Sequence, residues 1–293
     1  MNTSIRMPAV AGRFYPANAE QLLQELEGFL ALDPSPIHAL GCVAPHAGYV
    51  YSGSIAGAVY ARIAVPRCCV VLCPNHTGLG PPLSIMSSGA WQTPLGSVPI
   101  DEELATELKR RLPQLTEDCD AHRAEHAIEV QLPFLEVRQP SLKFVPIVLG
   151  TSRFEPLEAL GIALADVCRT RDERPLIVAS SDMNHYESDV ITRRKDHMAI
   201  DRVLALDARG LHVRDETQIN FRNCTMRKDG LAALSRVAAN QALDIYRGPR
   251  HQHFHRLLET DVVDPMLHTH LLLGAFFVKT FGSNCDHFFF GCR

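Results

Sequence analysis

Three histidines follow apolar stretches of the chain, at positions where buried strands of a sheet are expected to end. The three pairs of apolar run and histidine are 39–44 with His46, 67–73 with His76, and 175–179 with His185. Side chains that follow neighbouring parallel strands meet at one edge of a sheet, where α/β proteins bind ligands. Imidazole nitrogens bind iron, zinc and copper. We therefore expect the three histidines to share one metal pocket, in which two ligand nitrogens lie within roughly 4 Å of each other.

A fourth histidine lies between two acidic residues in the stretch EHAIEVQLPF, residues 125–134. On a helix, Glu125 and Glu129 share a face at i and i+4, and His126 points elsewhere. These side chains fit a helix cap or a salt bridge. They equally fit the rim of the pocket, where Glu125 or His126 acts as an acid or base or orients a metal ligand. Both interpretations stay open.

Two further side chains are candidates for the surroundings of the metal. Asp182 precedes the third histidine by three positions. It either holds a histidine ligand in its metal-binding tautomer or caps the helix that follows. Tyr49 and Tyr51 lie in a predicted loop, residues 47–53, whose glycines let the backbone approach a ligand. The tyrosines fit the pocket wall and the core equally well.

The elements that must position these side chains alternate between strand and helix patterns. Continuous apolar runs predict strands buried on both faces, and leucines at helical spacing predict amphipathic helices. The expected strands are 39–44, 67–73, 143–149, 175–179 and 271–278, and the expected helices are 18–32, 54–63 and 155–170. This alternation predicts an α/β fold with a mainly parallel central sheet flanked by helices. Because no Gly/Ser-rich linker divides residues 1–293, we expect a single domain.

Composition narrows the class of protein. The formal charge of −4 at pH 7 gives no reason to expect a nucleic-acid partner. The longest apolar run, 271–278, is too short to span a bilayer, and the N-terminal residues lack the pattern of a signal peptide. We therefore expect a cytoplasmic protein with no membrane partner. Nine cysteines without a CxxC pair indicate mostly buried free thiols, not a structural zinc site.

Six motifs of the chain, in this order and at this spacing, resemble the Memo family. They are PAVAGRFY (8–15), APHAGYVYSG (44–53), CPNHTG (73–78), TPLG (93–96), EHAIEVQLPF (125–134) and SSDMNHY (180–186). The resemblance covers roughly the first 220 residues and weakens after about residue 235.

The resemblance implies more than the residues do by themselves. Memo proteins are similar in fold to the class III extradiol ring-cleaving dioxygenases, which use non-haem Fe(II). The resemblance implies an iron or copper site made of two histidines and a cysteine. By motif position the two histidines are His46 and His76, and His185 takes the place of the dioxygenase acid/base. In many prokaryotes the family's gene belongs to the AmmeMemoRadiSam set, so the resemblance also implies a radical-SAM protein as a partner.

The chain departs from the family at the third metal ligand, a cysteine in a Thr-x-Cys-Gly motif. The corresponding stretch here is NCTMRKDG (223–230), in which no Cys-Gly pair follows Thr225 and Met226. Cys224 precedes the threonine. It reaches the metal only if this turn rearranges; otherwise the metal keeps two protein ligands and Cys224 is a buried or incidental thiol.

Two functions stay open from the sequence. The first is a metal-dependent oxidoreductase with dioxygenase-like activity on an unknown small molecule. The second is a non-catalytic binding protein that uses the pocket for metal or for a peptide or partner segment. The intact histidines favour the first, and the missing Thr-x-Cys-Gly motif favours the second. A zinc hydrolase is a weaker interpretation, because the chain has no HExxH motif.

Overall fold

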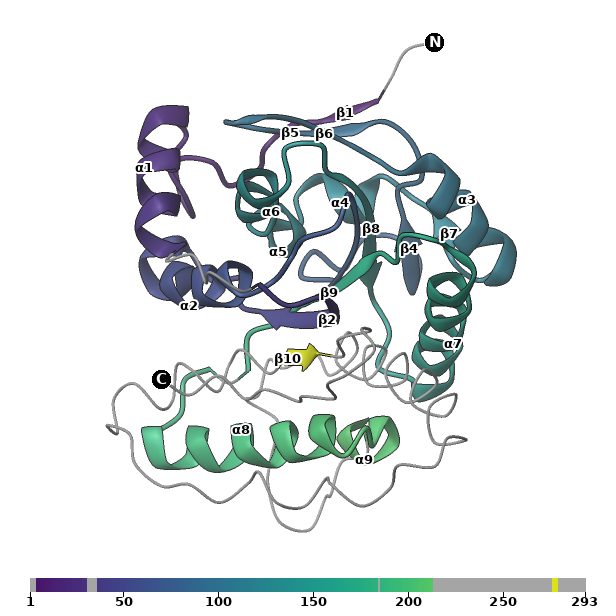
Figure 1. Cartoon of the computed structure of the whole chain (residues 1–293). Helices are drawn as coiled ribbons and strands as arrows, with labels where there is room; N and C mark the ends of the chain where they lie inside the picture. Colours follow the sequence, from purple (N-terminus) through teal and green to yellow (C-terminus); the bar gives the residue numbers. More distant parts are fainter. Residues whose placement is uncertain (1–3, 31–35, 184, 213–275, 279–293) are drawn as a thin grey trace.

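The computed structural model describes residues 4–30, 36–183, 185–212 and 276–278 (Figure 1). The strands are β1 (Ile5–Arg6), β2 (Ala39–Ala44), β3 (Cys68–Pro74), β4 (Leu83–Ile85), β5 (Ala90–Thr93), β6 (Gly96–Pro99), β7 (Thr116–Glu117), β8 (Lys143–Leu149), β9 (Leu176–Ser180) and β10 (Phe276–Val278). The helices are α1 (Ala19–Phe29), α2 (Tyr49–Ala61), α3 (Glu102–Arg111), α4 (Asp120–Arg123), α5 (His126–Glu129), α6 (Leu132–Arg138), α7 (Phe154–Thr170), α8 (Asp189–Leu204) and α9 (Ala208–His212).

The larger sheet of the described chain has the strand order β10-β2-β9-β3-β8-β4-β7. Its inner strands β2, β9, β3 and β8 are parallel, whereas β10 and β4 run antiparallel to β2 and β8. A smaller sheet has the order β1-β5-β6. The prediction of an α/β fold with a mainly parallel central sheet is therefore confirmed. The last strand, β10, includes part of the predicted run 271–278, and residues 271–275 lie outside the described residues.

Apart from Lys143 at the start of β8 and Ser180 at the end of β9, the inner strands are apolar, because helices cover both faces of the sheet (Figure 1). Along β3 the side chains alternate: Cys69 and Val71 join one core cluster, and Val70 and Leu72 join the other. The first cluster includes side chains from α1, α2 and α6, and the second includes side chains from α3, α7 and α8. Continuous apolar runs thus predicted these strands correctly. The cysteines of β2 and β3 are buried, as expected.

The prediction of a loop at residues 47–53 is wrong, because α2 begins at Tyr49 and includes most of these residues. Its glycines serve packing between helices. A Cβ atom at Gly53 would lie 2.5 Å from the ring of Phe29, and one at Gly57 would lie 2.5 Å from the Phe29 carbonyl oxygen. The C-terminal end of α1 therefore packs against α2 at a contact that only glycine permits.

No helix among the described residues is both long enough and apolar enough to cross a membrane.

Candidate metal centre

Strand register places two of the candidate side chains next to each other. Ala44, the last residue of β2, pairs with Ser180, the last residue of β9. His46 and Asp182 each follow by two positions, so they lie side by side at the C-terminal edge of the sheet. The backbone N–H of His46 donates to the Asp182 carboxylate at 2.7 Å. The parallel arrangement of the strands thus accounts for this contact.

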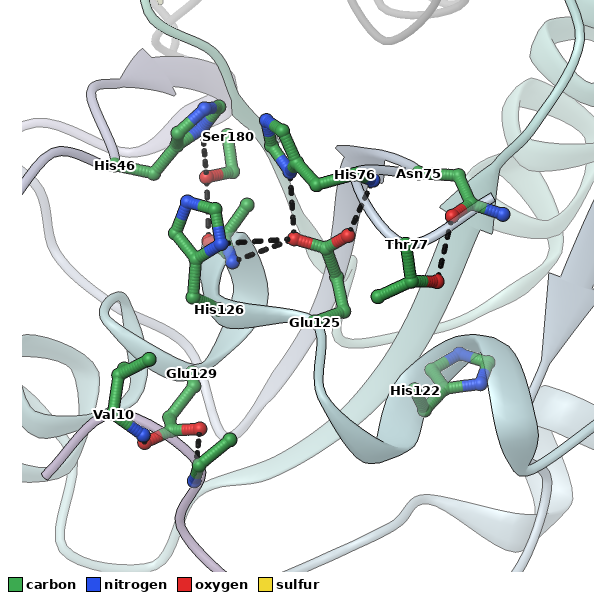
Figure 2. A network of polar contacts seen from close by, with 12 residues as sticks. Val10, His46, Asn75, His76, Thr77, His122, Glu125, His126, Glu129 and Ser180 are labelled. Carbon is green, nitrogen blue, oxygen red and sulfur yellow. Dashed lines mark hydrogen bonds and ion pairs between the residues drawn. The ribbon is translucent and has the colours of Figure 1, made fainter. Parts of the chain in front are cut away.

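Three histidines come together at this edge: His46, His76 and His126 (Figure 2). One ligand nitrogen from each lies within 4.8 Å of the other two. The ring centroids are 5.1 Å apart for His46 and His76, 5.6 Å for His46 and His126, and 4.5 Å for His76 and His126. The cluster combines the ends of two inner strands with the start of a short helix, α5.

His46 is buried and held at two points. In addition to its backbone bond to Asp182, its Nδ1 lies 3.1 Å from the Ser180 hydroxyl. Burial lowers the pKa of His46 to about 4, although the Asp182 charge opposes this shift. The imidazole is therefore neutral at pH 7, which is the form that binds metals.

His76 is held by the buried carboxylate of Glu125 (Figure 2). One carboxylate oxygen accepts the backbone N–H of His76 at 2.7 Å, and the other lies 2.8 Å from its Nδ1. Burial raises the pKa of Glu125, but the bonds and charge of His76 outweigh it, so this pKa lies below its usual value. The carboxylate is thus ionised and accepts a hydrogen from Nδ1, which leaves Nε2 of His76 available for a metal.

The turn that follows β3 also holds His76 in place. The Asn75 side-chain oxygen accepts from the Thr77 hydroxyl at 2.9 Å and from the Gly78 N–H at 2.7 Å. Its amide nitrogen donates to the Leu79 carbonyl at 2.6 Å. Because Asn75 closes the turn in this way, the backbone on both sides of His76 is restrained.

His126 is the first residue of α5, and Glu125 is the cap of that helix. The Glu125 carboxylate accepts the N–H of Ala127 at 3.0 Å. The same carboxylate lies 3.5 Å from Nδ1 of His126, whose other ring nitrogen points away from it (Figure 2). Burial lowers the pKa of His126, with the Glu125 charge opposing. The cap and the pocket interpretations of Glu125 thus describe a single arrangement.

Glu129 belongs to a different network from Glu125. It is fully buried, and it accepts from the N–H groups of Ala9 and Val10 and from the Tyr15 hydroxyl. It also pairs with Arg6. Glu129 therefore ties the N-terminal segment to α5, and it does not face the histidines.

Arg6 extends this hydrogen-bond network toward the three histidines. Its guanidinium donates to the carbonyls of His122 at 3.1 Å and of Glu125 at 2.8 Å. It also lies 4.2 Å from the Trp91 ring centroid. A buried residue of β1 thus holds the backbone directly before His126.

His185 lies beside the three-histidine cluster and is joined to it through Asp182. Its Nε2 is 3.3 Å from the Asp182 carboxylate, and the same carboxylate is 3.9 Å from Nε2 of His46. The hydrogen bond from Asp182 raises the pKa of the half-exposed His185. Burial acts to raise the pKa of Asp182, but its contacts with the two histidines lower it to about 2. Asp182 does not cap the helix that follows, because the cap of α8 is Ser188.

Tyr49 lies in the core and does not line the pocket. Its ring packs against Phe29 and Phe134, and its hydroxyl donates to the Val130 carbonyl at 2.8 Å. Tyr51 is exposed. Of the two roles left open for these tyrosines, packing explains Tyr49, which anchors the start of α2 close to His46.

Cys224, the predicted third metal ligand, lies outside the described residues. Within the described part of the chain, His126 completes a set of three ligand atoms instead. The sequence had suggested His126 only as an acid or base or as a residue that orients a ligand. No local pattern indicates the new placement, because His126 reaches the sheet edge from α5 and not from a strand end.

The donor set is chemically suited to a first-row transition metal. Two ligands at about 2.1 Å from one ion lie at most about 4.2 Å apart, so separations of up to 4.8 Å require only small side-chain rotations. Imidazoles suit iron, copper, zinc and nickel. Buried partners at Nδ1 of His46 and His76 are the usual surroundings of metal-binding histidines.

Comparison with known proteins agrees with the motifs. A family model described as Memo-like protein matches residues 6–226. A MEMO1 family protein of Pyrobaculum aerophilum is 42% identical over 219 residues, which cover 71% of this chain and 78% of that protein. One from Methanopyrus kandleri is 42% identical over 220 residues, covering 70% and 78% of the two chains. One from Sulfurisphaera tokodaii is 41% identical over 224 residues, covering 71% and 79%. The chain therefore belongs to the Memo family.

Proposed function

We propose that this protein binds one transition-metal ion through His46, His76 and His126 and uses it for oxidoreductase chemistry on a small molecule. The observation that carries the proposal is the convergence of three imidazoles within 4.8 Å. Two of them have hydrogen-bond partners at Nδ1, which leaves Nε2 for the metal. His46 is also neutral at pH 7, because burial lowers its pKa to about 4.

Iron or copper is the proposed metal. Both suit imidazole ligands, and the likeness of the Memo family to non-haem Fe(II) dioxygenases favours a redox metal. An ion held by these three histidines would supply redox and Lewis-acid chemistry. The protein contributes the three imidazole ligands, the buried Glu125 carboxylate behind His76, and the Asp182 carboxylate between His46 and His185.

His185 is the proposed acid/base of this site. The hydrogen bond to Asp182 raises the pKa of His185, so this imidazole keeps its second proton to a higher pH than a free imidazole does. The side chain is 36% exposed, and it can therefore meet a substrate that enters from solvent. Asp182 holds the backbone N–H of His46 at the same time, so one carboxylate sets the positions of a ligand and of the proton donor.

The remaining proposals rest on the family. The substrate is a small molecule, a radical-SAM protein of the AmmeMemoRadiSam system is the partner, and the site of action is the cytoplasm. Copurification with a radical-SAM protein from native cells tests the partner, and fractionation of the same cells tests the location.

Metal analysis of anaerobically purified protein tests the metal site. We expect the wild type to hold about one iron or copper ion per chain and His46→Ala, His76→Ala and His126→Ala to lose it. His197→Ala is the matched control, because His197 is an exposed histidine of α8. Equal metal content in the wild type and in all three site variants contradicts the proposal.

Cys224→Ser separates two ligand sets in the same experiment. If His126 is the third ligand, Cys224→Ser keeps its metal and His126→Ala loses it. The reverse result assigns the third place to Cys224, as the family pattern implies. A protein that keeps its metal but shows no metal-dependent oxygen consumption with any small-molecule substrate supports the second function, that of a non-catalytic binding protein.

A further inference from the structure

A chain of buried hydrogen bonds runs from α2 to His46. The Tyr60 hydroxyl donates to the side-chain oxygen of Gln131 at 2.8 Å. The amide nitrogen of Gln131 then donates to the Pro45 carbonyl at 2.9 Å and to the Ser180 hydroxyl at 2.8 Å. Tyr60 and Gln131 are fully buried, and Ser180 is 2% exposed. Because the Pro45 carbonyl can only accept, the Gln131 amide nitrogen must face it, and the orientation of the amide is fixed.

The direction of this chain determines what Ser180 offers to His46. A serine hydroxyl has one hydrogen, and Ser180 donates it to the Ala127 carbonyl at 2.6 Å. Its oxygen already accepts from Gln131, so toward His46 the hydroxyl is an acceptor only. Nδ1 of His46, at 3.1 Å, must therefore be the donor. A neutral imidazole that carries its hydrogen on Nδ1 has a free lone pair on Nε2.

A competing acceptor favours the other tautomer. The Asp182 carboxylate lies 3.9 Å from Nε2 of His46. Without an acceptor at Nδ1, the ring hydrogen would move to Nε2 and face this carboxylate. That tautomer has no lone pair at Nε2 for a metal. A hydrogen-bond acceptor at Nδ1 is therefore needed to favour the Nδ1–H tautomer.

We propose that Tyr60, Gln131 and Ser180 are positioning residues that hold His46 in the Nδ1–H tautomer and so keep Nε2 free. This inference rests on the proposed function, because Nε2 is kept free in order to bind the proposed metal. The tautomer itself is a property of the metal-free protein. None of these three side chains belongs to the proposed ligand set, and each acts through the next.

Nitrogen NMR of metal-free protein with ¹⁵N-labelled histidine tests the proposal, because the two ring nitrogens report directly which one carries hydrogen. The His46 signals are assigned by their loss in His46→Gln. We expect hydrogen on Nδ1 in the wild type. In Ser180→Ala we expect the Nε2–H form to increase about tenfold relative to Nδ1–H, since one hydrogen bond near 1.4 kcal/mol is lost. Tyr60→Phe should give a smaller shift in the same direction, and Ser180→Thr, which keeps the hydroxyl, should restore the wild-type ratio.

Ser84→Ala is the control for removal of a buried serine hydroxyl. Ser84 is fully buried on β4 and donates to the Pro81 carbonyl at 2.9 Å, away from the histidines. It should leave the His46 tautomer unchanged. In a parallel titration with Co²⁺ as the probe, Ser180→Ala should weaken binding by roughly 10–100-fold, and Ser84→Ala should not.

The outcomes separate the two proposals. Hydrogen on Nε2 of wild-type His46, or an unchanged tautomer in both Ser180→Ala and Tyr60→Phe, overturns the proposed role of the hydrogen-bonded side chains. If the tautomer shifts in the variants as expected but the wild-type protein binds no Co²⁺, iron or copper, the positioning role is upheld and the proposed metal function is refuted.

Discussion

Replacement of Glu125 by glutamine is the sharpest perturbation of the site. The carboxylate receives three hydrogens: the backbone N–H of His76 at 2.7 Å, the ring Nδ1–H of His76 at 2.8 Å, and the N–H of Ala127 at 3.0 Å. Glutamine keeps the shape of the side chain but replaces one acceptor oxygen with an amide donor. If its oxygen faces the ring and Ala127, its NH₂ group faces the backbone N–H of His76.

The magnitude follows from that mismatch. Glu125→Gln loses one charge-assisted hydrogen bond and brings two donors together in a fully buried site, which costs about 1.5–3 kcal/mol of stability. The His76 ring also loses its anionic partner. For a residue that orients a metal ligand, we expect metal affinity to fall roughly 10–100-fold.

The stability difference should depend on pH in a defined direction. The pKa of folded Glu125 lies below its ordinary value of 4.5. Its carboxylate therefore contributes stability above that pH, and the contribution is lost as the pH falls through the folded pKa. The gap between the wild type and Glu125→Gln should be largest near pH 7 and should shrink below pH 4.5.

Urea unfolding at several pH values and anaerobic titration with Co²⁺ measure the two effects. Asp101→Asn is the control: Asp101 is another buried acidic cap, accepts the Leu104 N–H at 2.9 Å, and belongs to α3. It should lower stability and leave metal affinity unchanged. Wild-type Co²⁺ affinity in Glu125→Gln, or an equal loss in Asp101→Asn, would refute the role of Glu125 at His76.

Three further predictions concern stability, each measured by urea unfolding. Arg6→Lys removes the planar fork that holds two carbonyls and a buried carboxylate, and it should destabilise the protein by about 3–5 kcal/mol; a loss under 1 kcal/mol would contradict this. Gly57→Ala places a Cβ 2.5 Å from the Phe29 carbonyl oxygen and should lower the free energy of unfolding by about 1–3 kcal/mol. Gly28→Ala, which meets open space in α1, should raise it by about 0.5–1 kcal/mol. Equal effects of the two substitutions would disprove the packing argument. Burial raises the pKa of Glu136 to about 7, so wild-type stability should fall as the pH rises from 4.5 through 7. The stability of Glu136→Gln should match that of the wild type near pH 5 and exceed it by about 1–3 kcal/mol at pH 8. Parallel pH profiles of the two proteins would argue against this role of burial.

The inner strands and the placement of His46 and His76 could be predicted from the sequence. A strand buried on both faces is a near-continuous apolar run, and parallel strands present their C-terminal ends at one edge of the sheet, so both histidines were expected at that edge. The motifs also indicated the family. Both inferences depend on residues that are close in sequence or on a rule that holds for every parallel sheet.

The start of α2 and the third member of the histidine cluster depended on the tertiary structure. Glycines at residues 47–53 favour a loop by local propensity, but Gly53 lies inside α2, where the ring of Phe29 excludes a side chain. His126 joins His46 and His76 from α5, and the backbone just before it is bound by Arg6, about 120 positions earlier. Such contacts arise when distant segments pack together, and no local periodicity encodes them.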